Sequence, residues 1–179
     1  MQVLSQNSYA RSILVLWLTG VGTMVSTSNA GPPALPETLE QLRDMSLDEL
    51  SNVDIIRMNL IVAREIEPSI DISYFERLID QMAEHVKLQI DFNEPFFEKY
   101  KADFDGSKEK WICTMIWQII TEDFGLGYLK GKLDDLDHSQ PWQKFVHGLL
   151  TRREGTCCTL PVLYLAIAQR LGYPRRSLR

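Results

Sequence analysis

The sequence predicts a mainly α-helical protein, and three observations carry that prediction. Apolar side chains recur at steps of three and four residues in several segments of the 179-residue chain. Ser-x-x-Glu pairs, which cap helix starts, stand before two of these segments. No segment alternates apolar and polar residues convincingly, as a half-buried strand would. With 45% hydrophobic and 24% charged residues, the chain has an ordinary globular composition and can build a core.

Residues 1–30 have the pattern of a secretory signal. Arg11 is the only charged residue there, and it precedes the apolar run Ser12–Val25, after which small residues lead to Ala30. The run has fourteen residues, whereas a membrane-spanning helix needs about 20. We therefore expect cleavage before Gly31, export to the periplasm or the extracellular space, and no stable membrane anchor after cleavage.

The first ordered element is expected near Ser46. Three prolines in "GPPALPE" make residues 31–45 a Pro-rich linker by sequence. Ser46 with Glu49 then forms a capping-box pattern. In "VDIIRMNLIVAREIEP", residues 53–68, apolar side chains follow at helical spacing until Pro68 stops the run. These features predict a helix in this stretch.

The strongest helical pattern begins after Ser73, which stands three residues before Glu76 and repeats the capping pattern. The apolar stripe behind it marks a core-facing helix face. "FNEPFFEKYKADFDGS", residues 92–107, is rich in aromatics and turn residues and is predicted to be a connection. We assign residues 46–104 to an N-terminal helical region. The stripe consists of Phe75, Leu78, Ile79, Met82, Val86 and Ile90.

The second region covers residues 105–179 and starts with a predicted helix over about 108–124. A glycine-rich loop with several acids follows. It lacks the glycine and the distant glutamate of a calcium-binding loop, so a solvated turn without metal is expected. The acids are Asp134, Asp135 and Asp137.

Two further helices are predicted near the C-terminal end of the sequence. A short one lies within "WQKFVHGLLTRR", residues 142–153, and a closing one runs over about 159–171. The closing helix is apolar on all sides, which is typical of a helix at the centre of a fold. Gly172 has the position of a C-terminal cap, and Pro174 prevents continuation.

The adjacent cysteines Cys157 and Cys158 precede this closing helix. Because Pro161 cannot lie deep inside a helix, the regular helix must begin at Cys158 or Thr159. Cys157 then lies within about one turn of the helix start, where unpaired N–H groups and the helix dipole favour a thiolate. Gly155 allows close backbone approach and leaves room for a substrate. Cys157 is thus a candidate nucleophile. Simple packing is the alternative, because cysteine is among the most buried residue types.

Three segments resemble a known family. "GTC" followed by "LPVLYLAIAQRLGYP" resembles the nucleophile segment of the transglutaminase-like cysteine superfamily. "NLIVAREIEPSIDISYFERLIDQMAEHV", residues 59–86, is similar to the helical part of its bacterial SirB-type branch, and "FVHGLLTRREGTC" resembles the link between the two. The resemblance covers most of residues 46–174. It implies a helical bundle that corresponds to the helical portion of an α+β, papain-like fold whose strands are missing.

The same resemblance implies roles for individual residues. Cys157 takes the place of the nucleophile, and Cys158 occupies a position that the family usually fills with a small residue. The family's catalytic histidine and acid come from strands after the Leu-Gly-x-Pro turn. Only five residues follow Pro174 here, so we expect a truncated core without turnover. His147 is the remaining candidate base, although a lone helical histidine is more often structural.

Two functions remain open at this point. The first is an exported SirB-type protein with a nucleophilic thiol and no turnover. The second is a non-catalytic helical module whose protein partner covers the exposed central helix. No stretch combines clustered bases with aromatics, so nucleic acid is not an expected partner. No cofactor is expected. A metal or redox site is less favoured, because adjacent cysteines do not easily share one tetrahedral ion. Its residues would be Cys113, Cys157, Cys158 and His147.

Overall fold

The computed structural model describes residues 35–129 and 139–173. The predicted signal at 1–30, the acids of the 134–137 loop and His138 lie outside the described residues. Among the described residues, no helix combines the length and the apolar character that crossing a membrane requires.

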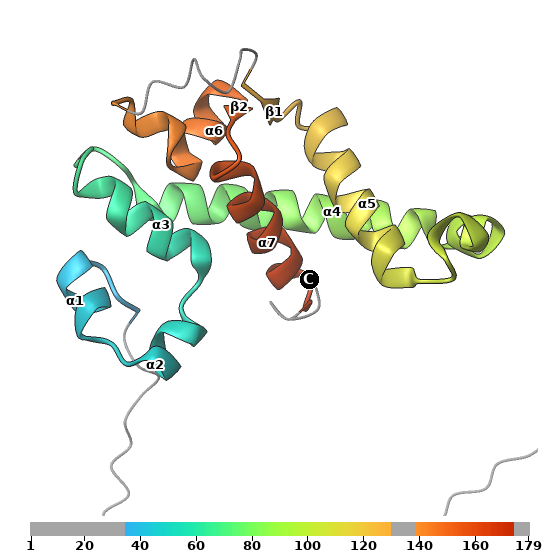
Figure 1. The fold of residues 1–179 in the computed structure, drawn as a ribbon, viewed down its shortest axis with the longest axis horizontal. Coiled ribbons are helices and arrows are strands. Elements are labelled where there is room, and N and C mark those ends of the chain that lie inside the picture. The colour runs from blue at the N-terminus through green and yellow to red at the C-terminus, as the bar shows by residue number, and fades with distance from the viewer. Residues whose placement is uncertain (1–34, 130–138, 174–179) are drawn as a thin grey trace, which may run out of the picture. The chain divides into compact units, whose positions relative to one another are not determined.

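The prediction of a mainly helical protein is confirmed (Figure 1). Two short 3-10 turns, at Lys101–Phe104 and Pro141–Gln143, accompany the regular elements. In chain order these elements are α1 (Leu39–Asp44), α2 (Leu47–Asn52), α3 (Ile55–Arg64), α4 (Ile72–Tyr100), α5 (Lys108–Glu122), β1 (Gly127–Tyr128), α6 (Val146–Arg152), β2 (Glu154–Gly155) and α7 (Thr159–Arg170).

The structure begins earlier than the sequence indicates, because helix α1 lies within the predicted linker 31–45. Thr38 caps this helix: its Oγ1 accepts the N–H of Gln41 at 3.2 Å, and the Gln41 side chain accepts the N–H of Thr38 in return. The periodic signal is weak because α1 buries only Leu42. The linker prediction is therefore wrong from Thr38 onward.

Local capping signals fix the next two helices. Ser46 and Glu49 form the predicted capping box: Ser46 Oγ accepts the N–H of Glu49 at 3.3 Å, and Glu49 Oε2 accepts the N–H of Ser46 at 2.7 Å. A separate helix α3 follows, because the carboxylate of Asp54 accepts the N–H of Ile56 at 2.6 Å and restarts the helix.

Helix α4 differs from its prediction at both ends. Its N-cap is Asp71, which accepts the N–H of Tyr74 at 3.0 Å, and not Ser73. It also continues to Tyr100 and passes through Pro95, so most of the predicted connection at 92–107 is helical. Pro95 lies on an exposed face of the helix. The far end is held by tertiary contact instead of local signals. Phe97 is buried, and its ring centroid lies 5.3 Å from that of Trp111 on α5.

Helix α7 is at the centre of the fold, as its apolar composition predicts. It crosses α4 and packs also against α3, α5 and α6 (Figure 1). Side chains from all five helices are fully buried between them, and each loses its exposed apolar area to this shared core. They include Ile56 and Leu60 of α3, Ile79 and Val86 of α4, Ile116 and Ile120 of α5, Leu149 of α6, and Leu160, Leu163 and Ile167 of α7.

The large exposed apolar side chains are not where the sequence places them. We expected the central helix to be exposed, but none of the large exposed apolar side chains among the described residues belongs to α7. Four of them instead lie every fourth residue along the second half of α4, and we call this set the α4 stripe. It consists of Leu88, Phe92, Phe96 and Tyr100, which are 62%, 75%, 53% and 46% exposed.

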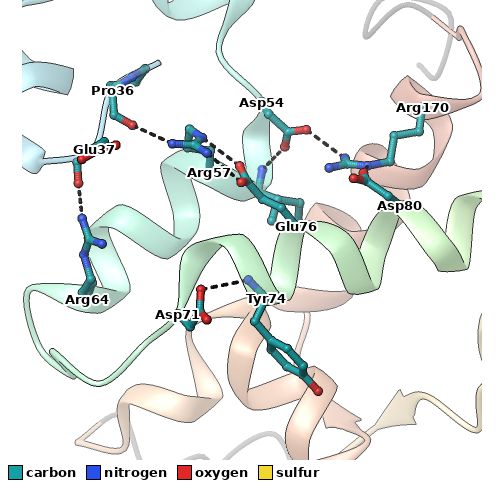
Figure 2. A network of polar contacts seen from close by, with 11 residues as sticks. Pro36, Glu37, Asp54, Arg57, Arg64, Asp71, Tyr74, Glu76, Asp80 and Arg170 are labelled. Carbon is teal, nitrogen blue, oxygen red and sulfur yellow. Dashed lines mark hydrogen bonds and ion pairs between the residues drawn. The ribbon is translucent and has the colours of Figure 1, made fainter. Parts of the chain in front are cut away.

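Charged side chains tie the end of α7 to two other helices (Figure 2). Arg170 lies 2.9 Å from the carboxylate of Asp54, which caps α3, and 2.5 Å from that of Asp80 on α4. Arg57 and Glu76 form a second link between α3 and α4 in the same network. The three helices are thereby fixed relative to one another at the end of α7 that lies away from the cysteines.

A short parallel ladder fixes the other end. Gly127 donates its N–H to the carbonyl of Arg153 at 3.2 Å, and Leu129 donates to the carbonyl of Gly155 at 2.7 Å. The sequence indicates no strand here, because two residues per strand are too few for alternation to appear. The ladder links the segment after α5 to the segment that leads into α7, where the cysteines lie.

Candidate functional site

The adjacent cysteines lie where the sequence places them, at the entry to α7. Cys158 is the N-cap residue, and Thr159 is the first residue of the helix. Pro161 falls in the first turn, where its missing N–H leaves no hydrogen bond unmade. Cys157 and Cys158 are both free thiols, and both are exposed. The predicted position of Cys157 at a helix start is therefore confirmed.

Two buried threonines hold the turn that carries these thiols. The N–H of Thr156 donates to Thr159 Oγ1 at 2.8 Å, and the N–H of Cys158 donates to Thr156 Oγ1 at 3.2 Å. The Thr156 hydroxyl in turn donates to the carbonyl of Gln143 at 2.9 Å. Sequence reasoning missed both threonines. Their Thr-x-x-Thr spacing before a helix was the available signal, since threonine is a preferred capping residue.

Gly155 lets the turn pack closely on the core, and it does not open space beside the thiol. A Cβ atom at this residue would approach Leu149 Cδ1 to 2.8 Å and both Leu160 Cγ and Thr159 Oγ1 to 2.9 Å. Real Cβ atoms essentially never come so close, so a side chain here would push the turn away from the core. The expectation that Gly155 leaves room for a substrate is wrong, because this residue is buried.

The two thiols are not equivalent, although both are exposed. The pKa of Cys158 is raised, first because its S–H is hydrogen bonded to the sulfur of Cys157, and then by partial loss of hydration. Cys158 therefore ionises less readily than a free cysteine. Both thiols are exposed, so burial does not distinguish them, and the difference is the raised pKa of Cys158.

His147 is occupied elsewhere. Its side chain is buried, and its Nε2 lies 3.2 Å from the carboxylate of Glu67. The ring stacks on Phe145 and meets Phe75 edge-on. Burial lowers the pKa of His147, and Glu67 partly opposes this shift. Among the described residues, no hydrogen bond joins His147 to Cys157. The position favours a structural role over the role of a base.

The remaining candidate ligands are also dispersed. His85 lies 2.7 Å from Asp123 and links α4 to the end of α5. Cys113 is half-buried and hydrogen bonded to Tyr164, whose pKa is raised mainly by burial and also by this contact. Within the described part of the chain, no three His, Cys, Asp or Glu side chains come together in a way that could hold a metal ion.

An aromatic pair that the sequence analysis missed lies beside the ladder. Trp117 of α5 and Tyr128 of β1 have ring centroids 6.1 Å apart and are 39% and 56% exposed. Tyr128 is also the register partner of Gly155, which leads into the turn that carries the thiols.

No protein-family model, curated protein or solved structure matches this chain. The likeness to the transglutaminase-like superfamily thus depends on the three quoted segments alone.

Proposed function

We propose that this chain is an exported, transglutaminase-like protein of the SirB type, in which Cys157 is a nucleophilic thiol. The supporting observation is the turn before α7. It presents Cys157 to solvent, and the pKa of the neighbouring Cys158 is raised. The N–H groups of Cys158, Thr159 and Leu160 are all bonded to Thr156, so the positive end of the helix dipole is what favours a thiolate at this place.

The described residues supply the nucleophile but no partner for turnover. A thiolate that attacks an acyl carbon forms a thioester once the leaving group departs, and a base must then activate water or an amine to release the acyl group. His147 bonds to Glu67, and His85 bonds to Asp123. We therefore expect one acyl group per chain to be transferred to Cys157, followed by no further reaction above background.

An activated aryl ester tests this function. Reduced protein should release about one phenolate per chain in a rapid phase, as expected for an acyl-enzyme that accumulates, and mass spectrometry should place the acyl group on Cys157. Cys157→Ser should abolish the rapid phase, and Cys113→Ser is the matched control that should keep it. Equal acylation of Cys157 and Cys158 would contradict the proposal. Steady turnover that is lost in His147→Gln would show that this histidine is the base after all.

Export is tested separately from the chemistry. The charge and apolar pattern of residues 1–30 supports cleavage close to Gly31. N-terminal sequencing of protein from the periplasm or the medium should begin within a few residues of Gly31. Cytoplasmic protein that retains Met1 would contradict the proposed location.

A second function, binding to another protein, is supported by the α4 stripe. Contiguous exposed apolar surface on a soluble protein marks an interaction site more often than scattered apolar residues do. A photo-crosslinking amino acid in place of Phe92 should give discrete adducts in producing cells. The same substitution at Lys87, an exposed residue off the stripe, is the matched control and should give none. Identical patterns at both positions would exclude the stripe as a binding surface.

A further inference from the structure

Three features set the Cys157–Cys158 pair apart from an ordinary exposed cysteine. Both thiols are free and exposed, they are adjacent in the chain, and the Cys157 side chain is the first cause of the raised pKa of Cys158. The third cysteine of the chain, Cys113, is half-buried. An accessible thiol beside a second thiol that can resolve it is typical of redox-responsive sites.

We propose that Cys157 and Cys158 form a thiol–disulfide switch, in which Cys157 exchanges with a small-molecule disulfide and Cys158 resolves the product into a disulfide between the two neighbours. The proposal adds regulation to the site described above. It depends on the proposed function only for what is switched off, and the exchange itself does not depend on that function.

The two steps balance in atoms and electrons. In the first, the Cys157 thiolate attacks one sulfur of the small disulfide, and that molecule leaves as one thiolate. In the second, Cys158 loses its proton to solvent and attacks the Cys157 sulfur, which expels the second small thiolate. The protein pair loses two electrons and two protons, and the small disulfide is reduced to two thiols.

The raised pKa of Cys158 fits the order of the steps. While Cys157 is free, its side chain is the first cause of that raised pKa. Once Cys157 is bound in a mixed disulfide, its sulfur can no longer bear a negative charge, and this cause is removed. Cys158 is then easier to ionise at the moment when its attack is required.

The closed form strains the turn, because adjacent Cα atoms lie about 3.8 Å apart and disulfides usually span about 4.4–6.8 Å. Bringing the two sulfurs together requires the peptide between Cys157 and Cys158 to rotate, and the hydrogen bond from Cys158 N–H to Thr156 Oγ1 is the contact that must yield. The bonds from Thr156 N–H to Thr159 Oγ1 and from Thr156 Oγ1 to Gln143 lie beneath it. These anchor the start of α7 independently of the cysteines.

Oxidised glutathione is the probe that tests the switch on the full chain. After reaction, acid quenching and peptide mapping, wild-type protein should carry a transient glutathione adduct and then a Cys157–Cys158 peptide lighter by two hydrogen atoms. Cys158→Ser should stop at a stable adduct on Cys157. Cys157→Ser should react slowly, and Cys113→Ser is the matched control that should behave as wild type.

The outcomes separate the switch from the proposed function. A wild-type adduct as stable as that of Cys158→Ser, or a disulfide that includes Cys113 or a second chain, overturns the switch. If Cys157 of the reduced protein accepts an acyl group but Cys158 never resolves the adduct, the nucleophile stands and the switch falls. If the disulfide closes but the reduced protein is not acylated, the reverse holds. With both correct, the oxidised protein shows no rapid acylation, and dithiothreitol restores it.

Discussion

Arg57 of α3 binds Glu76 of α4 through two parallel hydrogen bonds, from Nε to Oε1 at 2.8 Å and from Nη2 to Oε2 at 2.7 Å (Figure 2). The third guanidinium nitrogen, Nη1, donates to the carbonyl of Pro36 at 3.2 Å. The two side chains are only 13% and 19% exposed, so water screens the pair weakly. The bidentate geometry therefore links two helices and the segment before α1.

This pair should show measurable coupling in a double-mutant cycle. Arg57→Met and Glu76→Gln together should lose less stability than the sum of the single variants, with a coupling of about 1–3 kcal/mol for a charge-assisted, largely buried pair. Urea unfolding measures it. The exposed pair Lys110–Asp105 is the matched control and should show no measurable coupling. Equal coupling free energies in both cycles would mean that burial of the Arg57–Glu76 pair does not determine its coupling.

Gly148→Ala should destabilise the protein by more than about 2 kcal/mol, because overpacking against backbone cannot be relieved by a rotamer change. A Cβ at Gly148 would lie 2.0 Å from the carbonyl oxygen of Trp142. Gly127→Ala is the matched control, since a Cβ there meets no atom within 4 Å. Equal unfolding midpoints for Gly148→Ala and Gly127→Ala would contradict the predicted loss of stability. Gly148→Ala should also change the rate at which Cys157 is alkylated, because Trp142 neighbours Gln143, whose carbonyl anchors Thr156.

Acid should weaken the fold through His147. Burial lowers the pKa of His147 in the folded protein, so between that value and the unfolded value of about 6.5 the unfolded chain binds more protons. Stability is therefore fully present above pH 6.5, declines as the pH falls through this window, and levels off below the folded pKa. Urea midpoints between pH 8 and 5 should show a shallower decline in His147→Gln. An unchanged decline would assign the effect to other groups.

The α4 stripe should account for most of the dye-accessible apolar surface. Phe92 and Phe96 are more than half exposed, so Phe92→Ser and Phe96→Ser should lower the fluorescence of a bound hydrophobic dye while leaving the unfolding midpoint nearly unchanged. Leu163→Ala removes a fully buried side chain of α7 and is the contrasting variant. It should lower the unfolding midpoint strongly, because the free energy of unfolding falls by about 2–5 kcal/mol. Dye binding that persists without both phenylalanines would place the apolar surface elsewhere.

Elements specified by local signals could be predicted from the sequence. The helix expected over 108–124 is α5, and the closing helix expected over 159–171 is α7, because each has its own apolar pattern and its own end signals. The capping box of Ser46 and Glu49 needs only four consecutive residues to form. The central position of α7 also follows from sequence, since a helix apolar on all sides must be covered on all sides.

Elements specified by distant contacts could not be predicted in this way. The continuation of α4 beyond Pro95 depends on the packing of Phe97 against Trp111, which no local pattern announces. The role of His147 is set by Glu67 and Phe75, far away in the sequence. Local propensity predicts that a proline ends the helix, and it assigns no contacts to a lone histidine. Tertiary packing decides both the length of α4 and the role of His147.

In the candidate site, too, features set by local signals could be predicted and features set by distant contacts could not. The place of Cys157 could be inferred, because Pro161 restricts where the helix starts. The anchoring of Thr156 to Gln143 could not, since it depends on how the Pro141–Gln143 turn packs beside the helix entry. The aromatic pair beside the ladder was missed for a similar reason, because its two rings come from different elements.

The central place of α7 also sets the order in which a growing chain can fold. All four helices that cover α7 precede it in the sequence, so during synthesis their apolar faces have no central helix to pack on until residues 159–170 have been made. Folding that awaits such late, non-local contacts leaves an extended period in which apolar surface stays open to chaperones and to aggregation. A nascent chain in that state is not yet folded and can still pass through a narrow channel. If residues 1–30 direct export, the late arrival of α7 keeps the polypeptide competent for passage through a secretion channel.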